Sequence, residues 1–544
     1  MGQILFWLEA SVASVLFVAL GLGISSRIPK RRWIVRYFLE ITWWPLAVLP
    51  LLVAIGGFAA VEFCAGGARL PLIAASVAGG LFIVASVVLS RRAKKPSAIG
   101  DGPRASTWRL PRILLAWAAA VVLTGMTLWN LDLAVRQEMT SMRLEAGAIA
   151  LSAAPSRIPD SQNAALLYRH AWEMLDSQKD TGKDWNKRIE GWLQPEKGTF
   201  NPDDKQMLEF LRKQAPIIDL LQKAAELPGC NFGVEYNPPS INMAMPTLAG
   251  VRGLGRLLCL SSCVAAHQGR VVDAVNDISA ALAISNHCRE DPSFIGIIVS
   301  IRTETMALES YQYMINQGPL TPDIVNVRHL DPFLNFPALI LRSIRLETAG
   351  GMSAFAMPEA FSLVAARDIG PARVFLMRDA ADPYRVFLWR DDVAAYLRAM
   401  RTYERLATLP YYENVREWNA VEWKSSGGVL SKTLTPSLAW AGSLAARADA
   451  QNRIFMLGLA MGRYRLAEGA FPSDLGQLVP KYLLAVPVDP FSGKPMKMVQ
   501  TKEQITIYSI GPDMKDDGGK PIDPKVNLSN NPPPQGDIAL TLRR

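Results

Sequence analysis

Four apolar segments at the start of the chain constrain its fold more than any other feature. They are Ile4–Ile24, Trp43–Val61, Leu70–Leu89 and about Ile113–Leu131. Each has close to the roughly 20 residues that a helix needs to cross the hydrocarbon core of a bilayer. Glu9 is the only charged residue within them, whereas helices that cover a globular core carry a polar stripe. The segments therefore predict a transmembrane region of four helices over residues 1–135.

Basic residues predict the orientation of these four helices. The chain carries a net charge of +9, and residues 1–131 hold 13 Lys and Arg against 4 Asp and Glu. The basic residues gather between the first and second segments and between the third and fourth, which places those two loops in the cytoplasm. The first segment is a poor signal peptide because its basic cluster follows the apolar run. We therefore expect a protein of the bacterial cytoplasmic (inner) membrane with a large extracytoplasmic part.

The rest of the chain has no excess of charge. Residues 132–544 hold 45 basic and 45 acidic side chains. They contain no basic run and no interleaving of basic and aromatic residues of the kind that contacts nucleic acids. We therefore expect the membrane and protein partners outside the cytoplasm as the binding partners, and no nucleic acid.

Residues 136–330 read as an irregular α-helical domain. Apolar residues recur at helical spacing in Asn163–Leu175, in Asp204–Leu227 and again in Leu248–Gln317. The stretch Ala265–Ser285 resembles the loop and second helix of a tetratricopeptide-type hairpin. No repeat of about 34 residues is visible, so a regular solenoid is not expected.

The chain offers few residues for the common catalytic and metal sites. It has four histidines and no H-E-x-x-H, Walker A or G-x-S-x-G motif. Cys259, Cys263 and His267 share a helix face, which allows a zinc site. A plain core face is favoured, because the first and last of them lie about 12 Å apart along a helix. A disulfide between Cys230 and a helix cysteine, such as Cys288, is left open.

The sequence after residue 330 divides into a helical connecting region, 331–435, and an α+β module, 436–544. In the module, apolar spacing predicts a long amphipathic helix over Ser437–Ala467. Gly469 is placed to end it, because glycine accepts the left-handed conformation of a helix C-cap. Prolines punctuate the crossover that follows, and the strands Lys494–Val499 and Gln504–Ser509 then flank a short polar turn.

Three blocks of this module resemble the globular head of the major, G-type pseudopilin of type II secretion systems. They are YRL-x2-G-x-F-P in Tyr464–Pro472, LVP-x-YL-x2-VP-x-DP in Leu478–Pro490, and YS-x-GPD-x2-DDGG in Tyr508–Gly519. The resemblance implies a long helix packed on a small antiparallel sheet. Residues 150–520 are also similar to a group of large, uncharacterised membrane-anchored bacterial proteins, and that similarity carries over no activity.

The loop after the second strand is the best candidate for a ligand site. Asp513, Asp516 and Asp517 precede a pair of glycines, and Ca²⁺ favours such oxygen-rich, flexible sites. The pseudopilin resemblance implies calcium bound by the main-chain oxygen of Ile510, by Asp513 and by Asp537 before the final strand. An ordinary solvated acidic turn is the alternative.

Two functions from different classes remain. The first is a membrane-tethered extracytoplasmic structural or protein-interaction protein with a pseudopilin-like head, associated with secretion or pilus-like machinery. The second is a cell-envelope hydrolase of unrecognised type. We favour the first because the sequence shows no paired nucleophile and base.

Overall fold

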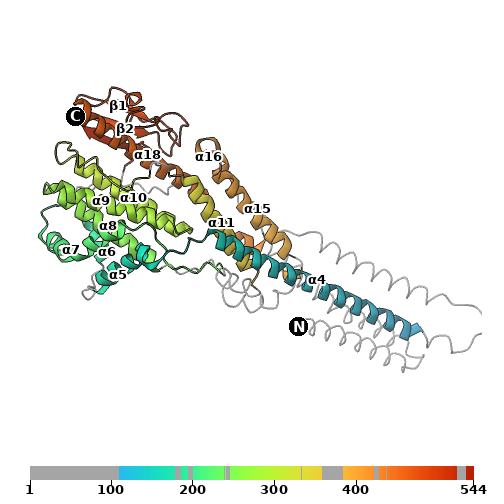
Figure 1. Ribbon diagram of the computed structural model, residues 1–544. Coiled ribbons are helices and arrows are strands. Elements are labelled where there is room, and N and C mark those ends of the chain that lie inside the picture. Colours follow the sequence, from blue (N-terminus) through green and yellow to red (C-terminus); the bar gives the residue numbers. More distant parts are fainter. Residues whose placement is uncertain are drawn as a thin grey trace, which may run out of the picture. The chain divides into compact units, whose positions relative to one another are not determined.

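The computed structural model describes the chain in separate segments. These are residues 109–177, 185–193, 200–237, 239, 246–331, 334–357, 384–386, 388–421, 428–435, 438–523 and 534–544. Helices make up most of this part, and a sheet lies near the C-terminus (Figure 1). The chain divides into two compact units, each assembled from separate stretches of sequence. The first comprises residues 1–144, 354–398 and 423–435, and the second comprises residues 145–353, 399–422 and 436–544.

The predicted transmembrane region needs correction. In the part of the chain that the structure describes, no helix is both long and apolar enough to cross a membrane. The first three predicted spans lie outside the described residues. The fourth falls in α4 (Arg109–Ala153), a helix that continues through a charged stretch containing Asp132, Arg136 and Glu138. The residues that the structure describes therefore contradict the prediction of four transmembrane helices, and they do not support the inner-membrane localisation drawn from it.

A buried carboxylate joins two helices of the first unit. The helices are α15 (Trp389–Ala407), which begins in this unit, and α17 (Val429–Leu434). Asp392 of α15 is 1% exposed and accepts hydrogen bonds from the backbone amides of Leu430 (2.8 Å) and Ser431 (2.9 Å). The hydroxyl of Tyr384 donates a third bond at 2.6 Å. Asp392 thus satisfies amides that the start of a helix leaves without partners.

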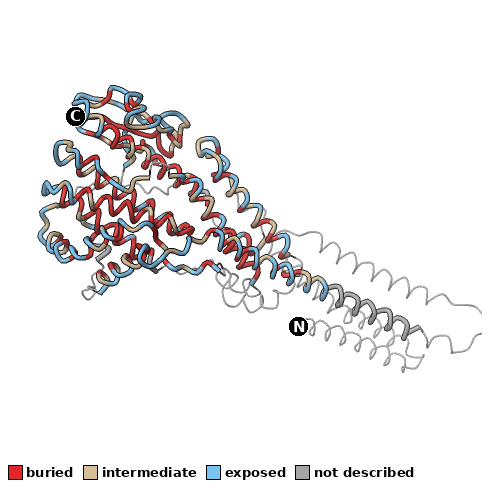
Figure 2. The backbone as a smooth tube through the Cα atoms, in the orientation of Figure 1, coloured by how far each residue is buried: buried red, intermediate tan, exposed pale blue. Residues whose placement is uncertain are grey.

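The second unit contains a helical body. Its helices are α5 (Ala164–Ser177), α6 (Trp185–Trp192), α7 (Lys205–Ala225), α8 (Pro246–His267), α9 (Val271–Arg289), α10 (Phe294–Ile315) and the greater part of α11 (Phe336–Phe355). α8, α9 and α10 pack against one another, and α5 and α7 pack on this group. Gly269, with φ of 72°, makes the turn between α8 and α9. Buried residues concentrate along these helices (Figure 2).

The C-terminal module lies in the same unit. Its elements are α18 (Ala439–Glu468), the 3-10 helix η4 (Leu475–Leu478), β1 (Lys497–Gln500), β2 (Gln504–Ser509) and β3 (Ile538–Arg543). β2 lies between β1 and β3 and is antiparallel to both. α18 ends where Gly469 takes φ of 80°, as the sequence indicated. β2 has the predicted bounds, whereas β1 begins three residues later because Lys494 and Met496 pair with the crossover instead.

One face of α18 packs on the sheet. Ile505 and Ile507 of β2 are fully buried, and so is Leu457 of α18. Gly458 lies so close to Leu540 of β3 that a Cβ atom at this position would overlap the leucine side chain. The small residue therefore permits the close approach of helix and sheet.

The helical body and the module share one core. The rings of Tyr311 in α10 and Phe455 in α18 meet edge to face, with centroids 4.6 Å apart. The side-chain amide of Gln312 donates to the carbonyl of Thr541 (2.7 Å) and accepts from its backbone amide (2.9 Å). Gln312 thus pairs with the outer edge of β3 as a neighbouring strand would, and protects an edge that could otherwise pair with another chain.

Candidate functional site

The predicted calcium loop adopts a tightly turned backbone. Gly511, Met514, Gly518 and Gly519 all have positive φ, between 62° and 85°. Gly511 needs to be glycine for a second reason, since a Cβ atom there would lie 2.5 Å from the carbonyl oxygen of Gly536. The loop therefore lies against the residues that lead into β3, as the predicted cage requires.

The predicted ligands make different contacts in this loop. Ile510 is buried, and its amide donates to Asp489 (3.2 Å). One oxygen of Asp513 accepts from the amide of Lys515 (3.1 Å), whereas its Oδ2 is buried without a partner among the described residues. Asp516 forms an ion pair with Lys497 on β1, and this pairing lowers the pKa of Asp516.

Asp537 contacts the other half of the loop. It is 1% exposed and accepts hydrogen bonds from the amides of Gly519 (2.6 Å) and Asp517 (3.3 Å). Burial raises the pKa of Asp537, and the charges of Asp516 and Asp517 raise it further. A cation here would relieve this repulsion.

The residues fit a calcium cage only in part. The unpartnered oxygen of Asp513 and the raised pKa of Asp537 favour a cation, whereas Lys497 already neutralises Asp516. Across the described residues, no three His, Cys, Asp or Glu side chains are grouped so as to hold a metal ion. Calcium binding stays a prediction, and Asp513 and Asp537 are the carboxylates that would carry it.

A second carboxylate, which the sequence analysis did not single out, holds the module together. Asp489 in the proline-rich crossover is 2% exposed. Its Oδ1 accepts from the amide of Phe491 (3.0 Å) and the hydroxyl of Ser509 (2.6 Å). Its Oδ2 accepts from the hydroxyl of Ser492 (2.8 Å) and the amide of Ile510 (3.2 Å). All four bonds are internal, so Asp489 ties the crossover to the end of β2 and has a structural role.

The four cysteines that the structure describes are buried and unbridged. Cys230, Cys259, Cys263 and Cys288 are free thiols, each no more than 2% exposed. Burial raises the pKa of each thiol well above its usual value, so none is prepared to act as a thiolate. His267 lies apart from this buried set, with a side chain that is 36% exposed.

The asparagine and tyrosine near the start of α5 fix a neighbouring loop. Asn163 donates to the carbonyl of Asn231 (3.0 Å) and accepts from its amide (2.9 Å). The hydroxyl of Tyr168 bonds to Nδ1 of His287 (2.7 Å), and Nε2 of that ring faces the carbonyl of Leu227 (3.2 Å). A carbonyl only accepts, so Nε2 carries the proton and Nδ1 accepts from tyrosine. Burial lowers the pKa of His287 to about 4, and the ring is a neutral structural link.

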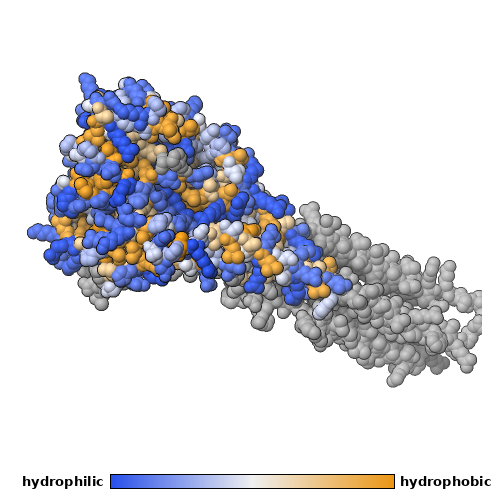
Figure 3. Space-filling view, viewed as in Figure 1, coloured by the Kyte–Doolittle hydropathy of each residue, from blue (hydrophilic) through white to orange (hydrophobic). Residues whose placement is uncertain are grey.

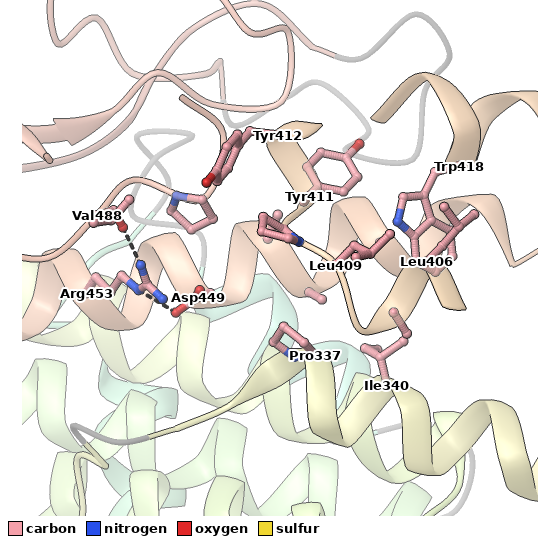
Figure 4. A pocket seen from close by; sticks show the side chains of 16 residues that line it. Pro337, Ile340, Leu406, Leu409, Tyr411, Tyr412, Trp418, Asp449, Arg453 and Val488 are labelled. Carbon is pink, nitrogen blue, oxygen red and sulfur yellow. Dashed lines mark hydrogen bonds and ion pairs between the residues drawn. The ribbon is translucent and has the colours of Figure 1, made fainter. Parts of the chain in front are cut away.

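The structure brings together a pocket that no sequence motif indicated. α11, the end of α15, α16 (Tyr411–Ala420), α18 and the crossover all contribute to its walls. The cavity is about 170 Å³ in volume. Leu406 and Trp418 lie at one end, and the opposite end is formed by Asp449, Arg453 and Val488 (Figure 4). All of these residues belong to the second unit.

Small residues form the side of the pocket that α18 contributes. Gly442 lines it, and so do Ala445 and Ala446, which lie about one helical turn further along. A Cβ atom on Gly442 would lie 2.7 Å from the ring of Trp418, so the indole ring rests directly on the helix backbone. Trp418 is 2% exposed and forms a buried wall of the pocket.

Charged groups occur at one end of the pocket. Nε of Arg453 donates to Oδ1 of Asp449 at 2.7 Å, and Nη1 donates to the carbonyl of Val488. Burial raises the pKa of Asp449 to about 6, and Arg453 opposes that rise. The pair is close to neutral as a whole, and it is the polar feature of an otherwise apolar and aromatic cavity.

Apolar side chains also reach the surface of the module. Leu484 is 83% exposed, and Val488 and Val499 are about two-fifths exposed. Hydrophobic surface interrupts the hydrophilic surface of this module on the face shown in Figure 3. Val488 belongs both to this surface and to the pocket.

Comparisons with known proteins return nothing similar. No family model matches the chain, no curated protein matches it, and neither does any solved structure.

Proposed function

We propose that this chain is a structural or protein-interaction protein that receives an apolar side chain of a protein partner in the pocket between α11, α16 and α18. The pocket carries the proposal, because it is apolar, aromatic on one wall and closed at its polar end by an internal ion pair. The resemblance of the C-terminal module to the major pseudopilin suggests a partner from secretion or pilus-like machinery.

The composition of the walls supports binding of a protein. Tyrosine, tryptophan, proline and leucine supply most of the large side chains around the cavity. Aromatic residues are enriched at protein interfaces, and anchors that fill well-packed pockets there carry much of the binding energy. The aromatic residues come from α16, which rests on α18 through the contact between Trp418 and Gly442. The pocket is therefore held in shape before a partner arrives.

Turnover of a substrate has less support in this pocket. Most enzymes that hydrolyse glycosidic bonds use two carboxyl groups that flank the scissile bond. Asp449 is the single carboxylate among the pocket-lining residues, and Arg453 occupies one of its oxygens. A hydrolase that uses a pair of carboxyl groups would therefore need a site other than this pocket.

Site-specific photo-crosslinking in the source cells tests the proposal. A photoreactive phenylalanine analogue replaces Tyr412 at the rim of the pocket, and a control replaces Gln268, an exposed residue in the turn after α8. We expect a discrete protein adduct from position 412 that is absent from position 268. The adduct should also disappear when Ala446→Leu fills the cavity. No adduct at position 412, or one that persists with Ala446→Leu, would contradict the proposal.

A further inference from the structure

We infer that the pocket recognises an extended peptide segment, with a side chain of phenylalanine or leucine size inside the cavity and the adjoining peptide group against the Asp449–Arg453 pair. The inference rests on the proposed function and names the chemistry of the partner. It depends on three observations, namely the volume of the cavity, the shape of its walls and the neutrality of its polar end.

The volume of the cavity selects the size of the side chain. It measures about 170 Å³, and an apolar protein cavity of about 150 Å³ stays dry and binds benzene. A single phenyl ring or a branched aliphatic side chain therefore fills the space. Burying such a group contributes roughly 1.5–3 kcal/mol, which suits an anchor within a larger interface.

The walls favour a ring or a branched aliphatic group over a polar group. Pro337 and Ile340 approach from α11, and Leu409 and Trp418 face them from the other side (Figure 4). Aromatic pairs in edge-to-face or offset contact gain about 0.5–1.5 kcal/mol beyond the burial of area. The small side chains of Ala445 and Ala446 leave the space between these walls open.

The polar end matches a peptide group. Arg453 uses Nε for Asp449 and one Nη1 hydrogen for Val488, whereas a guanidinium has five N–H donors. Within the described residues, the side chain of Asp449 is hydrogen-bonded to Arg453 through Oδ1. Its Oδ2 is therefore the acceptor that a ligand can use. A spare acceptor and spare donors thus lie side by side. A peptide group offers one N–H and one C=O and can satisfy both.

The charge of the pair argues against other ligands. A cationic amine would be attracted by the carboxylate of Asp449 but repelled by the guanidinium of Arg453 beside it. A carboxylate ligand would be attracted by Arg453 but repelled by Asp449. An acyl chain would fill the cavity and leave the polar groups at its end without partners, at a cost in desolvation. A neutral molecule with both a donor and an acceptor avoids these penalties.

Ligand-observed fluorine NMR on the full chain tests the inference. The probe is N-acetyl-4-fluorophenylalaninamide, which carries a ring and two peptide groups. The comparison ligands are 4-fluorotoluene, which has the ring alone, and 4-fluorophenethylammonium, which has the ring and a cation. We expect the peptide probe to bind at least about tenfold more tightly than either, and N-acetylglycinamide not to displace it.

Two variants and one control substitution locate the binding. Ala446→Leu should weaken binding of the probe at least about tenfold, whereas Ala467→Leu, at an exposed position on the same helix, should leave it unchanged. Arg453→Gln should weaken the peptide probe about tenfold and leave 4-fluorotoluene unaffected. If Arg453 acted only by maintaining the shape of the pocket, Arg453→Gln would weaken the binding of both ligands by the same factor. Thermal unfolding of each variant shows whether it has folded.

Three results would overturn the inference. They are no binding of the peptide probe by the folded chain, equal affinity for the ammonium ligand or 4-fluorotoluene, and parallel losses of both ligands in Arg453→Gln. These outcomes are separable from failure of the proposed function. A specific adduct at position 412 without binding of the peptide probe would support a protein partner but contradict recognition of a peptide group. Binding of the probe without an adduct would support recognition of a peptide group but contradict the protein partner.

Discussion

Replacing Asp489 by alanine should destabilise the C-terminal module more than any change at its surface. The substitution removes the acceptor for the Ser509 hydroxyl and for the amides of Phe491 and Ile510, and all three of these residues are less than 9% exposed. Each buried donor left without a partner costs about 1–3 kcal/mol. Partial rearrangement offsets some of that cost, so we expect a loss of about 3–5 kcal/mol in the free energy of unfolding.

The isosteric variant Asp489→Asn tests how much of this loss comes from the individual hydrogen bonds. Its oxygen can keep the bonds to Ser509 and Phe491, while its amide nitrogen can donate to Ser492 but would face the amide of Ile510, another donor. We therefore expect about half the loss seen with alanine.

Denaturant unfolding of the full chain measures the loss, and hydrogen exchange locates it. The amides of Phe491 and Ile510 should lose protection in Asp489→Ala, whereas Glu503→Ala at the exposed β1–β2 turn should change nothing. A loss below about 1 kcal/mol, or unchanged protection of those two amides, would refute the role assigned to Asp489.

Three further predictions concern other charged groups. Nη2 of Arg342 donates to carbonyls at the ends of α4 (2.6 Å) and α9 (2.8 Å). Arg342→Met should therefore lower the free energy of unfolding by about 2 kcal/mol, and the exposed neighbour Arg345→Met should not. Millimolar calcium should raise the melting temperature of the full chain relative to chelator, by an amount that corresponds to about 2.7 kcal/mol at a hundredfold excess over its dissociation constant; no shift, or one retained in Asp513→Ala, would eliminate the site. Asp449 has its pKa raised to about 6 in the folded chain, so the folded state binds the proton more tightly than the unfolded state. Relative to Asp449→Asn, the wild type should lose about 2 kcal/mol of stability as the pH rises from 4 to 6, and a flat difference in urea titrations over that range would contradict the assignment.

Local patterns allowed parts of the C-terminal module to be predicted. The end of α18 follows from the freedom of Gly469 to adopt positive φ, and the bounds of β2 follow from its alternating isoleucines. Asp489 escaped notice, although its position before a proline and near a serine and a glycine marked a turn. Its partner Ser509 is 20 residues away, and such a contact has no signature in a local window.

The apolar segments show that hydropathy alone does not predict the bounds of a helix. Length and hydropathy predicted a membrane span at Ile113–Leu131, but hydropathy does not indicate where a helix ends. The structure continues this stretch as α4 to Ala153, where Arg342 contacts its last carbonyl. A tertiary contact with a residue almost 200 positions away thus marks the boundary, and the sequence gives no local sign of it.

The pocket could not have been predicted from the sequence. Pro337, Tyr411, Ala446 and Pro490 come from four separate stretches, and each reads locally as an ordinary core or turn residue. The pocket depends on the packing of α16 on α18, where Trp418 contacts Gly442. This contact depends on the complementary shapes of the two helices, and no sequence motif encodes it.

The affinity of the partner captured at position 412 shows whether that partner uses the pocket. Isothermal titration would compare its binding to the wild-type chain, to Ala446→Leu and to Ala467→Leu. We expect a dissociation constant at least about tenfold higher for Ala446→Leu, because the added side chain occupies the space of the anchor, and an unchanged value for Ala467→Leu. Equal affinities for all three chains would show that the partner binds without using the pocket.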